Sequence, residues 1–234
     1  MATQKERFIQ EMFAQIAPTY DLLNSLLSLN VHKRWRPVAV RAARVGPGAK
    51  VLDLATGTGD LALLTARSVG PDGLVVGADF CEPMLRLGQQ KSRQAGAERV
   101  CLTLGSADWL PFADGTFDAV MMGFALRNVP NRPNCIREMA RVTRSGGWVV
   151  NLDLTRPRRD WLARGYRFYQ DRVMPLVGGL VSRQRQAYEY LPQSIQGFPP
   201  PEEIAETFRQ AGLEEVSWQS LTYGLATVHS GRKP

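Results

Sequence analysis

The fold is decided by the stretch Val51-Leu-Asp-Leu-Ala-Thr-Gly-Thr-Gly-Asp60. A short apolar run ends there in two glycines, and a helical pattern at residues 61–69 follows at once. Glycine in such a loop lets the backbone adopt costly dihedral angles and approach a ligand closely. The stretch therefore predicts a strand, a ligand-binding loop and a helix in series.

The rest of the chain alternates apolar, strand-like runs with helical patterns. This alternation is typical of a doubly wound α/β fold, in which helices cover both faces of a parallel sheet through right-handed crossovers. We predict strands at 51–54, 74–78, 100–104, 117–122, 148–154, 213–219 and 223–229; helices at 61–69, from about Pro83, at 132–144 and at 201–211; a Gly146-Gly147 turn; and helices within 4–44 that begin near Pro18 and Pro37.

The charge around the glycine loop favours a cationic ligand. Gly57 and Gly59 with Ala62 also match NAD-binding loops, so the loop alone leaves NAD open. Asp60 follows at the helix N-terminus, where its carboxylate would repel a pyrophosphate. Together with Asp53 it suits a ligand that carries an ammonium and a sulfonium, such as S-adenosylmethionine. Helix capping is the alternative role for both aspartates.

Two further strand ends carry groups suited to an adenosine. Asp79 ends the second strand, where it is placed to take both ribose hydroxyls, as in NAD enzymes. After the third strand, a backbone N–H near Ala107 and the Asp108 carboxylate are placed to read the adenine edge; a polar turn is the alternative for Asp108. We predict S-adenosylmethionine as the cofactor, bound by Asp53, Gly57, Thr58, Gly59, Asp79, Ser106, Ala107 and Asp108.

Composition narrows the class of protein. Cys81, Cys101 and Cys135 are widely spaced and form no CxxC pair, which argues against a disulfide framework or a metal site and favours a reducing compartment. The first residues lack an apolar signal core, and no apolar run approaches the ~18 residues of a membrane span. We therefore expect a soluble, cytoplasmic protein without a bound metal.

The net charge of +7 is concentrated in one segment. Between Arg156 and Arg185 eight arginines stand against two aspartates, which leaves a local charge of +6 among several aromatic residues. Three interpretations are open: a solvated helix face, an anionic lipid surface, or a nucleic-acid surface.

The chain resembles the ubiquinone/menaquinone biosynthesis C-methyltransferase family over nearly its whole length, and four segments carry the resemblance. The glycine loop with Asp79 and Met84-Leu85 is common to methyltransferases, whereas the other three segments are typical of this family. They are Phe13-x-x-Ile16-Ala17-x-x-Tyr20-Asp21-x-x-Asn24 with Ser28, His32, Trp35 and Arg36; Leu110-Pro111-Phe112 with Phe124-Ala-Leu-Arg127-Asn128-Val129; and Tyr188-x-Tyr190-Leu191-x-x-Ser194-Ile195-x-x-Phe198-Pro199. Departures from the usual family residues are Asn30, Ser106, Ala125, Ser145, Asp153 and Thr155.

The resemblance implies a class I S-adenosylmethionine-dependent methyltransferase fold, a Rossmann-like and mostly parallel sheet with one antiparallel C-terminal strand. It also implies methylation of a ring carbon in a prenylated quinol, demethylmenaquinol or the benzoquinol of the ubiquinone pathway. The reduced quinol is the reactive form, because its phenolate pushes charge onto the ring carbon. We expect Arg127 to stabilise this phenolate and Asn128 to orient the ring oxygen. Tyr20 is a candidate for hydrogen bonding to the quinol, and His32 is a candidate for the base. The alternatives are a salt bridge for Arg127, capping or packing for His32, and anchoring of the arm over the pocket for Tyr20.

One domain is expected to hold the whole chain. Its parts are a helical N-terminal arm that covers the pocket (1–45), a cofactor-binding core (46–155), a helical insert (156–200) and a closing helix with strands (201–234). Because a prenyl tail is insoluble in water, we expect the basic, aromatic insert to line the tail channel and to touch the inner face of the cytoplasmic membrane. The expected partners are the quinol and the membrane surface, without nucleic acid; the oligomeric state is open.

Three other functions are consistent with parts of the sequence. An NAD-dependent oxidoreductase would explain the glycine loop and Asp79, but Asp60 and the lack of a hydride-transfer constellation count against it. A methyltransferase for a sterol or another small lipid would share the cofactor site. A nucleic-acid-binding module would use the arginine segment, which lacks a surrounding recognition motif.

Overall fold

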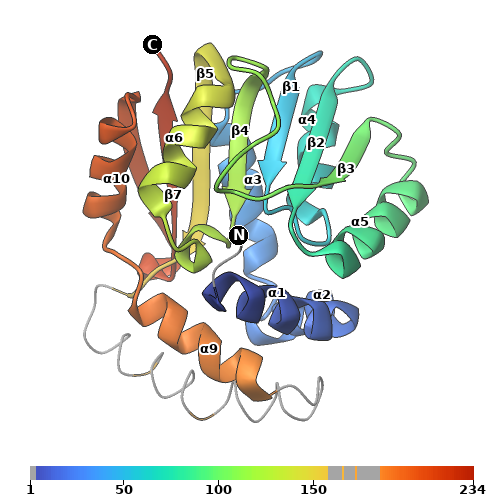
Figure 1. The fold of residues 1–234 in the computed structure, drawn as a ribbon, viewed down its shortest axis with the longest axis vertical. Helices are drawn as coiled ribbons and strands as arrows, with labels where there is room; N and C mark the ends of the chain where they lie inside the picture. The colour runs from blue at the N-terminus through green and yellow to red at the C-terminus, as the bar shows by residue number, and fades with distance from the viewer. Residues whose placement is uncertain (1–3, 158–164, 166–171, 173–184) are drawn as a thin grey trace.

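Seven strands form one sheet in the computed structural model, which describes residues 4–157, 165, 172 and 185–234. The strands are β1 (Lys50–Leu54), β2 (Leu74–Asp79), β3 (Val100–Leu104), β4 (Phe117–Gly123), β5 (Thr143–Leu154), β6 (Glu214–Leu221) and β7 (Ala226–Arg232), in the spatial order β3-β2-β1-β4-β5-β7-β6. The first five pair in parallel, and β7 runs antiparallel to both of its neighbours (Figure 1). The predicted doubly wound, mostly parallel sheet with one antiparallel C-terminal strand is confirmed.

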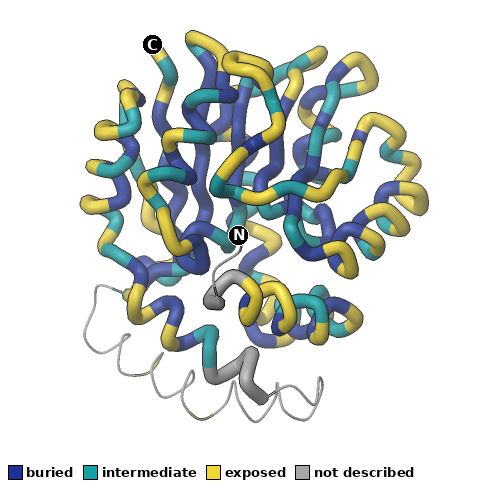
Figure 2. Tube along the Cα trace, viewed as in Figure 1, coloured by how far each residue is buried: buried dark blue, intermediate teal, exposed yellow. Residues whose placement is uncertain are grey.

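Helices cover both faces of this sheet because its central strands are apolar on both sides. In β1, Leu52 and Leu54 point to one core and Val51 points to the other. The buried strands run between outer helices whose far sides are exposed (Figure 2). The helices are α1 (Gln4–Ile16), α2 (Tyr20–Leu27), α3 (His32–Ala42), α4 (Asp60–Val69), α5 (Glu82–Gln94), α6 (Arg132–Val142), α9 (Arg185–Gln196) and α10 (Pro201–Gln210), with the 3-10 turns η1 (Ala17–Thr19), η2 (Leu126–Asn128) and η4 (Thr222–Gly224).

Two predicted boundaries are wrong. Pro37 lies inside α3 rather than at a helix start. The helix continues through it because Trp35 and Ala39, before and after the proline, are both buried against the sheet and outweigh local propensity. The Gly146-Gly147 pair lies within β5, in a stretch of irregular register where Phe117 pairs with Thr143 and Ala119 already pairs with Trp148. The expected turn is therefore an irregularity inside the strand.

The N-terminal arm (α1, η1, α2 and the start of α3) covers the edge of the sheet where the parallel strands end, next to α9 (Figure 1). Polar contacts join it to the core. The Thr58 hydroxyl donates to Asp21 Oδ1 at 2.6 Å, and Lys91 pairs with Asp21 at 2.9 Å and also with Asp60. Arg36 reaches Asp60 at 3.1 Å. This network holds the arm directly over the glycine loop.

Most of the predicted insert lies outside the described residues. Its described helix, α9, contacts α1 through the rings of Tyr190 and Phe8, whose centroids are 6.0 Å apart. Among the helices that the structure describes, none is both long and apolar enough to cross a bilayer.

Candidate active site

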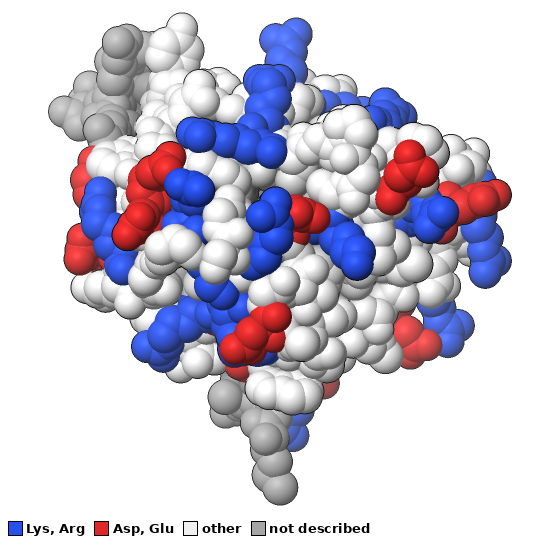
Figure 3. All heavy atoms as spheres, turned by 90° about the horizontal axis from the view of Figure 1, so that it is seen from above, with Lys and Arg blue, Asp and Glu red and all other residues white. Residues whose placement is uncertain are grey.

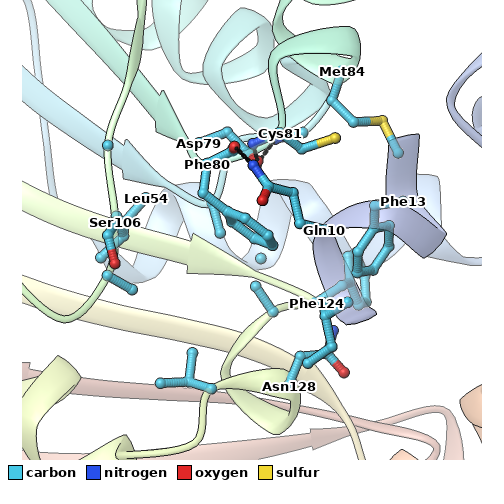
Figure 4. Close-up of a pocket in the computed structure, with 18 of the residues that line it drawn as sticks. Gln10, Phe13, Leu54, Asp79, Phe80, Cys81, Met84, Ser106, Phe124 and Asn128 are labelled. Carbon is cyan, nitrogen blue, oxygen red and sulfur yellow. Dashed lines mark hydrogen bonds between the residues drawn. The ribbon is translucent and has the colours of Figure 1, made fainter. Parts of the chain in front are cut away.

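A cavity of about 460 Å³ opens at the carboxyl edge of the sheet. Its walls come from the ends of β1, β2 and β4, from the loop after β3, and from α1 of the arm. At one end lie Phe13, Phe124 and Asn128, and towards the other lie Leu54 and Ser106 (Figure 4). We call it the first cavity; its volume is in the range of small-molecule sites.

Asp79 connects the glycine loop to this cavity. Its Oδ2 accepts a hydrogen bond from the Gly57 N–H and its Oδ1 accepts one from the Cys81 N–H, both at 2.8 Å. Burial raises the pKa of Asp79, and these N–H groups act against that rise by stabilising the carboxylate. Because each carboxylate oxygen can accept a further bond, Asp79 can hold the loop and bind ligand hydroxyls together.

The loop after β3 and α1 complete the walls of the first cavity. Ser106, Ala107 and Asp108 line it, as the sequence predicted. Gln10 was not predicted; its Nε2 donates to the Phe80 carbonyl at 2.7 Å, so α1 is fixed to the residue after Asp79 (Figure 4). Only the tertiary fold brings α1 here.

Three predicted cofactor residues lie behind the wall of the first cavity: Asp53, Thr58 and Gly59 are not among its lining residues. Asp53 is buried and accepts the Thr56 hydroxyl at 2.6 Å. The Thr58 hydroxyl binds Asp21, and Gly59, with φ +79°, begins α4. These three residues support the glycine loop from behind the wall of the first cavity.

The expected role of Asp60 also changes. Burial pushes its pKa upward, but Arg36 and Lys91 outweigh burial and leave the pKa below its usual value. The Asp60 carboxylate is therefore ionised and already paired. It joins the arm to the core, and Asp79 is the carboxylate that faces the first cavity.

Replacing Asp53 with Asn should change how stability depends on pH. Burial raises the pKa of Asp53 to about 7, so the folded state binds a proton more tightly than the unfolded chain, in which the pKa is 3.8. Wild-type stability from this group is therefore present at low pH and is lost as pH rises from about 4 to about 7. Relative to wild type, Asp53→Asn should gain on the order of 1 kcal/mol per pH unit across this window. Urea unfolding at several pH values measures the free energy of unfolding of both proteins. If the two free energies change in parallel with pH, the raised pKa of Asp53 is contradicted.

A second cavity, of about 320 Å³, lies between the arm and the core. All four residues predicted to be catalytic line it: Tyr20, His32, Arg127 and Asn128. The two cavities share a wall of four residues, Phe13, Tyr20, Phe124 and Asn128. A group bound in one cavity would thus be adjacent to a group bound in the other.

Arg127 is both paired and directed at the second cavity. Its Nη1 donates to Asp153 Oδ1 at 2.7 Å and to the Phe124 carbonyl, and its backbone N–H donates to Asp153 Oδ2 at 2.9 Å. The salt bridge considered from the sequence is therefore present. The buried Nε of Arg127, however, has no hydrogen-bond partner within the described part of the chain. Unpartnered buried donors of this kind are uncommon in folded proteins.

Tyr20, His32 and Asn128 differ in protonation and in hydrogen bonding. Burial raises the pKa of Tyr20, so its hydroxyl stays protonated. Burial, and secondly Arg36, lower the pKa of His32 to about 4, so this imidazole is neutral near pH 7 while its Nδ1 contacts the Ser28 hydroxyl. Asn128 Oδ1 accepts a hydrogen bond from the Tyr190 hydroxyl at 3.2 Å, which fixes the orientation of its amide.

Strained backbone marks the walls of the first cavity. Ala55 and Phe124, both of which line it, have φ values of +55° and +60°. Non-glycine residues rarely adopt this region, and such strain persists at sites of ligand contact. Nothing about an alanine or a phenylalanine in the sequence signals a positive φ.

Two ion pairs lie at the opposite edge of the sheet. This edge, seen from above in Figure 3, mixes Lys and Arg with Asp and Glu. Arg144 pairs with Asp118 at 2.6 Å, and Arg232 pairs with Glu215 at 3.1 Å. Such pairing is typical of a solvated surface. The arginine segment of the sequence lies mostly outside the described residues.

Several solved structures share this fold. The chain aligns with a SAM-dependent methyltransferase of Aquifex aeolicus at TM-score 0.59 and 18% identity, over 84% of this chain and 88% of that one. A SAM-dependent methyltransferase of Thermotoga maritima aligns at TM-score 0.65 and 18% identity, over 95% and 100%. The [4+2]-cyclase SpnF aligns at TM-score 0.73 and 16% identity, over 99% and 96%. At these identities the likeness shows the fold, which is that of S-adenosylmethionine-dependent methyltransferases.

Sequence relatives narrow the class to a family. A demethylmenaquinone methyltransferase of Bacillus cereus (strain ATCC 10987 / NRS 248) is 41% identical over 234 residues, with 100% of this chain and 99% of the relative covered. The ubiquinone/menaquinone biosynthesis C-methyltransferase UbiE of Geobacter sulfurreducens is 43% identical over 232 residues, with 99% and 90% covered. The model of the ubiE/COQ5 methyltransferase family matches residues 1–233, and the chain belongs to this family. The predicted resemblance and the S-adenosylmethionine-dependent methyltransferase class are confirmed, and the oxidoreductase alternative is set aside.

Proposed function

We propose that this chain transfers a methyl group from S-adenosylmethionine to a ring carbon of a reduced, prenylated quinol, with demethylmenaquinol as the first candidate. The observation that carries the proposal is the wall shared by the two cavities. The first cavity presents Asp79 and the polar loop at 106–108, and the second presents Arg127 and Asn128 among apolar side chains. The names of the relatives at 41% and 43% identity support this substrate class.

The residues of the first cavity fit S-adenosylmethionine. The Asp79 carboxylate, with lone pairs left after its two backbone bonds, would hold the ribose hydroxyls, and Ser106, Ala107 and Asp108 would contact the adenine. When bound, the cofactor supplies a methyl group on a positively charged sulfonium. The methyl acceptor would enter from the shared wall at Phe124 and Asn128.

Arg127 would stabilise the phenolate of the quinol. Arg127 lines the second cavity, where its positive charge would stabilise an oxyanion. Tyr20, which is protonated because burial raises its pKa and which lines the same cavity, would donate a hydrogen bond to the oxyanion. Asn128, held by Tyr190, would orient the ring, which keeps the reacting carbon in line with the methyl group.

His32 would serve only as a weak base. Burial lowers its pKa to about 4, far below the pKa of about 10 that is usual for a phenol. Proton loss from the quinol would therefore depend mainly on Arg127 and Tyr20, which lower the pKa of the phenol itself. Methyl transfer breaks the S–CH₃ bond and forms the C–CH₃ bond, after which the ring carbon must lose its proton. Neutral His32, which lines the same cavity, would accept that proton.

A methyl-transfer assay tests this proposal. The purified protein, with labelled S-adenosylmethionine, is offered chemically reduced demethylmenaquinol, a prenylated benzoquinol, a sterol and each quinone in its oxidised form. We expect label on the ring of a reduced quinol and none on the oxidised quinones. Label on the sterol alone, or no label with a protein that binds S-adenosylhomocysteine, would overturn the proposal.

Contact with a membrane surface follows from the same substrate. A prenyl tail partitions into a bilayer, so the second cavity would receive the quinol from a lipid surface.

We further infer that the chain forms one domain, since strands from the core at 46–155 and from the closing segment at 201–234 belong to the same sheet.

A further inference from the structure

Three leucines of the arm are exposed in succession. Leu22, Leu26 and Leu29 have exposed fractions of 60%, 45% and 78%. Leu22 and Leu26 lie one turn apart on α2, and Leu29 follows in the turn whose N–H bonds to the Leu26 carbonyl at 3.2 Å. Leu23 and Leu27 of the same helix are buried. The helix therefore carries one apolar side that packs into the protein and a second that lies on its surface; we call the three exposed residues the leucine ridge.

Packing within the described part of the chain does not explain the backbone conformation and the exposure of Leu29. Its φ is +49°, in the left-handed region that L-residues enter only at a cost, and the next residue, Asn30, is also left-handed at +61°. Asparagine tolerates that region, whereas leucine has no such preference. Because the Leu29 side chain is 78% exposed, burial within the described part of the chain does not offset this strain. Strain of this kind points to a contact with another partner.

The ridge ends at the mouth of the second cavity. Leu29 lines this cavity together with Ser28 and Val31, so one end of the ridge is continuous with the site proposed for the quinol. Thr222 lines the same cavity and accepts the Trp35 indole N–H at 2.8 Å. Its neighbour Tyr223 is 68% exposed. Apolar and aromatic side chains thus flank the opening.

Positive charge adjoins the ridge. Lys33 and Arg34, four and five residues after Leu29, are both exposed. No carboxylate of the described residues lies within ion-pair distance of either side chain. Asp21, which directly precedes Leu22, is already bound to Thr58 and Lys91. An apolar strip near two cations that form no ion pair with a described residue matches the chemistry of an anionic bilayer. The headgroups attract the cations, and the acyl region accepts the leucines.

We propose that the leucine ridge, with Lys33 and Arg34, docks the protein on an anionic bilayer and places the mouth of the second cavity at the lipid surface. The direction of tail entry, past Leu29, rests on the proposed function. Binding to the bilayer itself does not, because it is measured without turnover.

Vesicle sedimentation tests the docking surface. The full chain is mixed with vesicles of phosphatidylcholine with a quarter phosphatidylglycerol, and with phosphatidylcholine alone. We expect binding to the anionic vesicles that falls at least about tenfold in Leu22→Gln/Leu26→Gln and in Lys33→Glu/Arg34→Glu. Matched controls should bind like wild type: Leu104→Gln, an exposed leucine on β3, and Arg67→Glu/Arg93→Glu, exposed arginines on α4 and α5.

Two further measurements separate the outcomes. Leu22→Gln/Leu26→Gln should keep wild-type affinity for S-adenosylhomocysteine, which shows that the fold is intact, and wild-type methylation of a quinol without a prenyl tail. Wild-type vesicle binding by the ridge variants would overturn the proposal, as would a wild-type dimer that the ridge variants convert to a monomer without any vesicle binding. If the ridge binds vesicles but no quinol is methylated, the proposed function fails and the docking surface stands.

Discussion

Replacement of Asp79 by Ala is expected to weaken binding of S-adenosylhomocysteine by about two to four orders of magnitude. Two ribose hydroxyls would lose a charged acceptor, and each such hydrogen bond contributes roughly 1.5–3 kcal/mol. The Gly57 and Cys81 N–H groups, both 2.8 Å from the carboxylate, would lose their acceptor as well, so the glycine loop would also be less ordered. Isothermal titration calorimetry measures the affinity.

A matched carboxylate at the opposite edge controls for a general effect of charge. The Asp118 carboxylate accepts the Lys50 N–H at 2.7 Å and pairs with Arg144. Asp118→Ala therefore also removes a carboxylate that accepts a backbone N–H, here at the start of β1. This variant should bind S-adenosylhomocysteine like wild type. An Asp79→Ala protein that melts cooperatively and binds within threefold of wild type would contradict the assigned role of Asp79.

Arg127→Met is expected to lower kcat by about 10²–10³-fold, because the phenolate would lose a preorganised positive charge at the wall of the second cavity. The same change leaves the buried Asp153 carboxylate without its partner, and breaking a buried pair typically costs about 3–5 kcal/mol of stability. One variant therefore mixes a catalytic effect with a structural one.

The double variant Arg127→Met/Asp153→Asn separates the two effects. The neutral amide that replaces the Asp153 carboxylate would keep an acceptor for the backbone N–H of residue 127, so most of the lost stability should return. The rate should stay low, with the loss in kcat rather than in KM, if Arg127 acts on the phenolate. If the double variant regains both stability and rate, Arg127 only locks the loop after β4.

Local sequence patterns determined the scaffold and one side of the site. Alternating apolar runs predicted the strands, and parallel strands must end at one edge, so the residues just after them could be expected to meet there. Gly57, Asp79 and Ser106 meet at the first cavity for this reason. The family resemblance named Tyr20, His32, Arg127 and Asn128, which the structure brings together at the second cavity.

Long-range pairing decided the rest. Asp60 was expected to act on a ligand, but its charge is taken up by Lys91, 31 residues further along the chain, and by Arg36 of the arm. Gln10 reaches Phe80 across 70 residues, a contact that no local spacing indicates. Local pattern shows where a strand ends, because backbone hydrogen bonding sets that place. Which partner neutralises a charge, and whether a leucine such as Leu29 is buried, depends on segments distant in sequence, and only the folded chain brings them together.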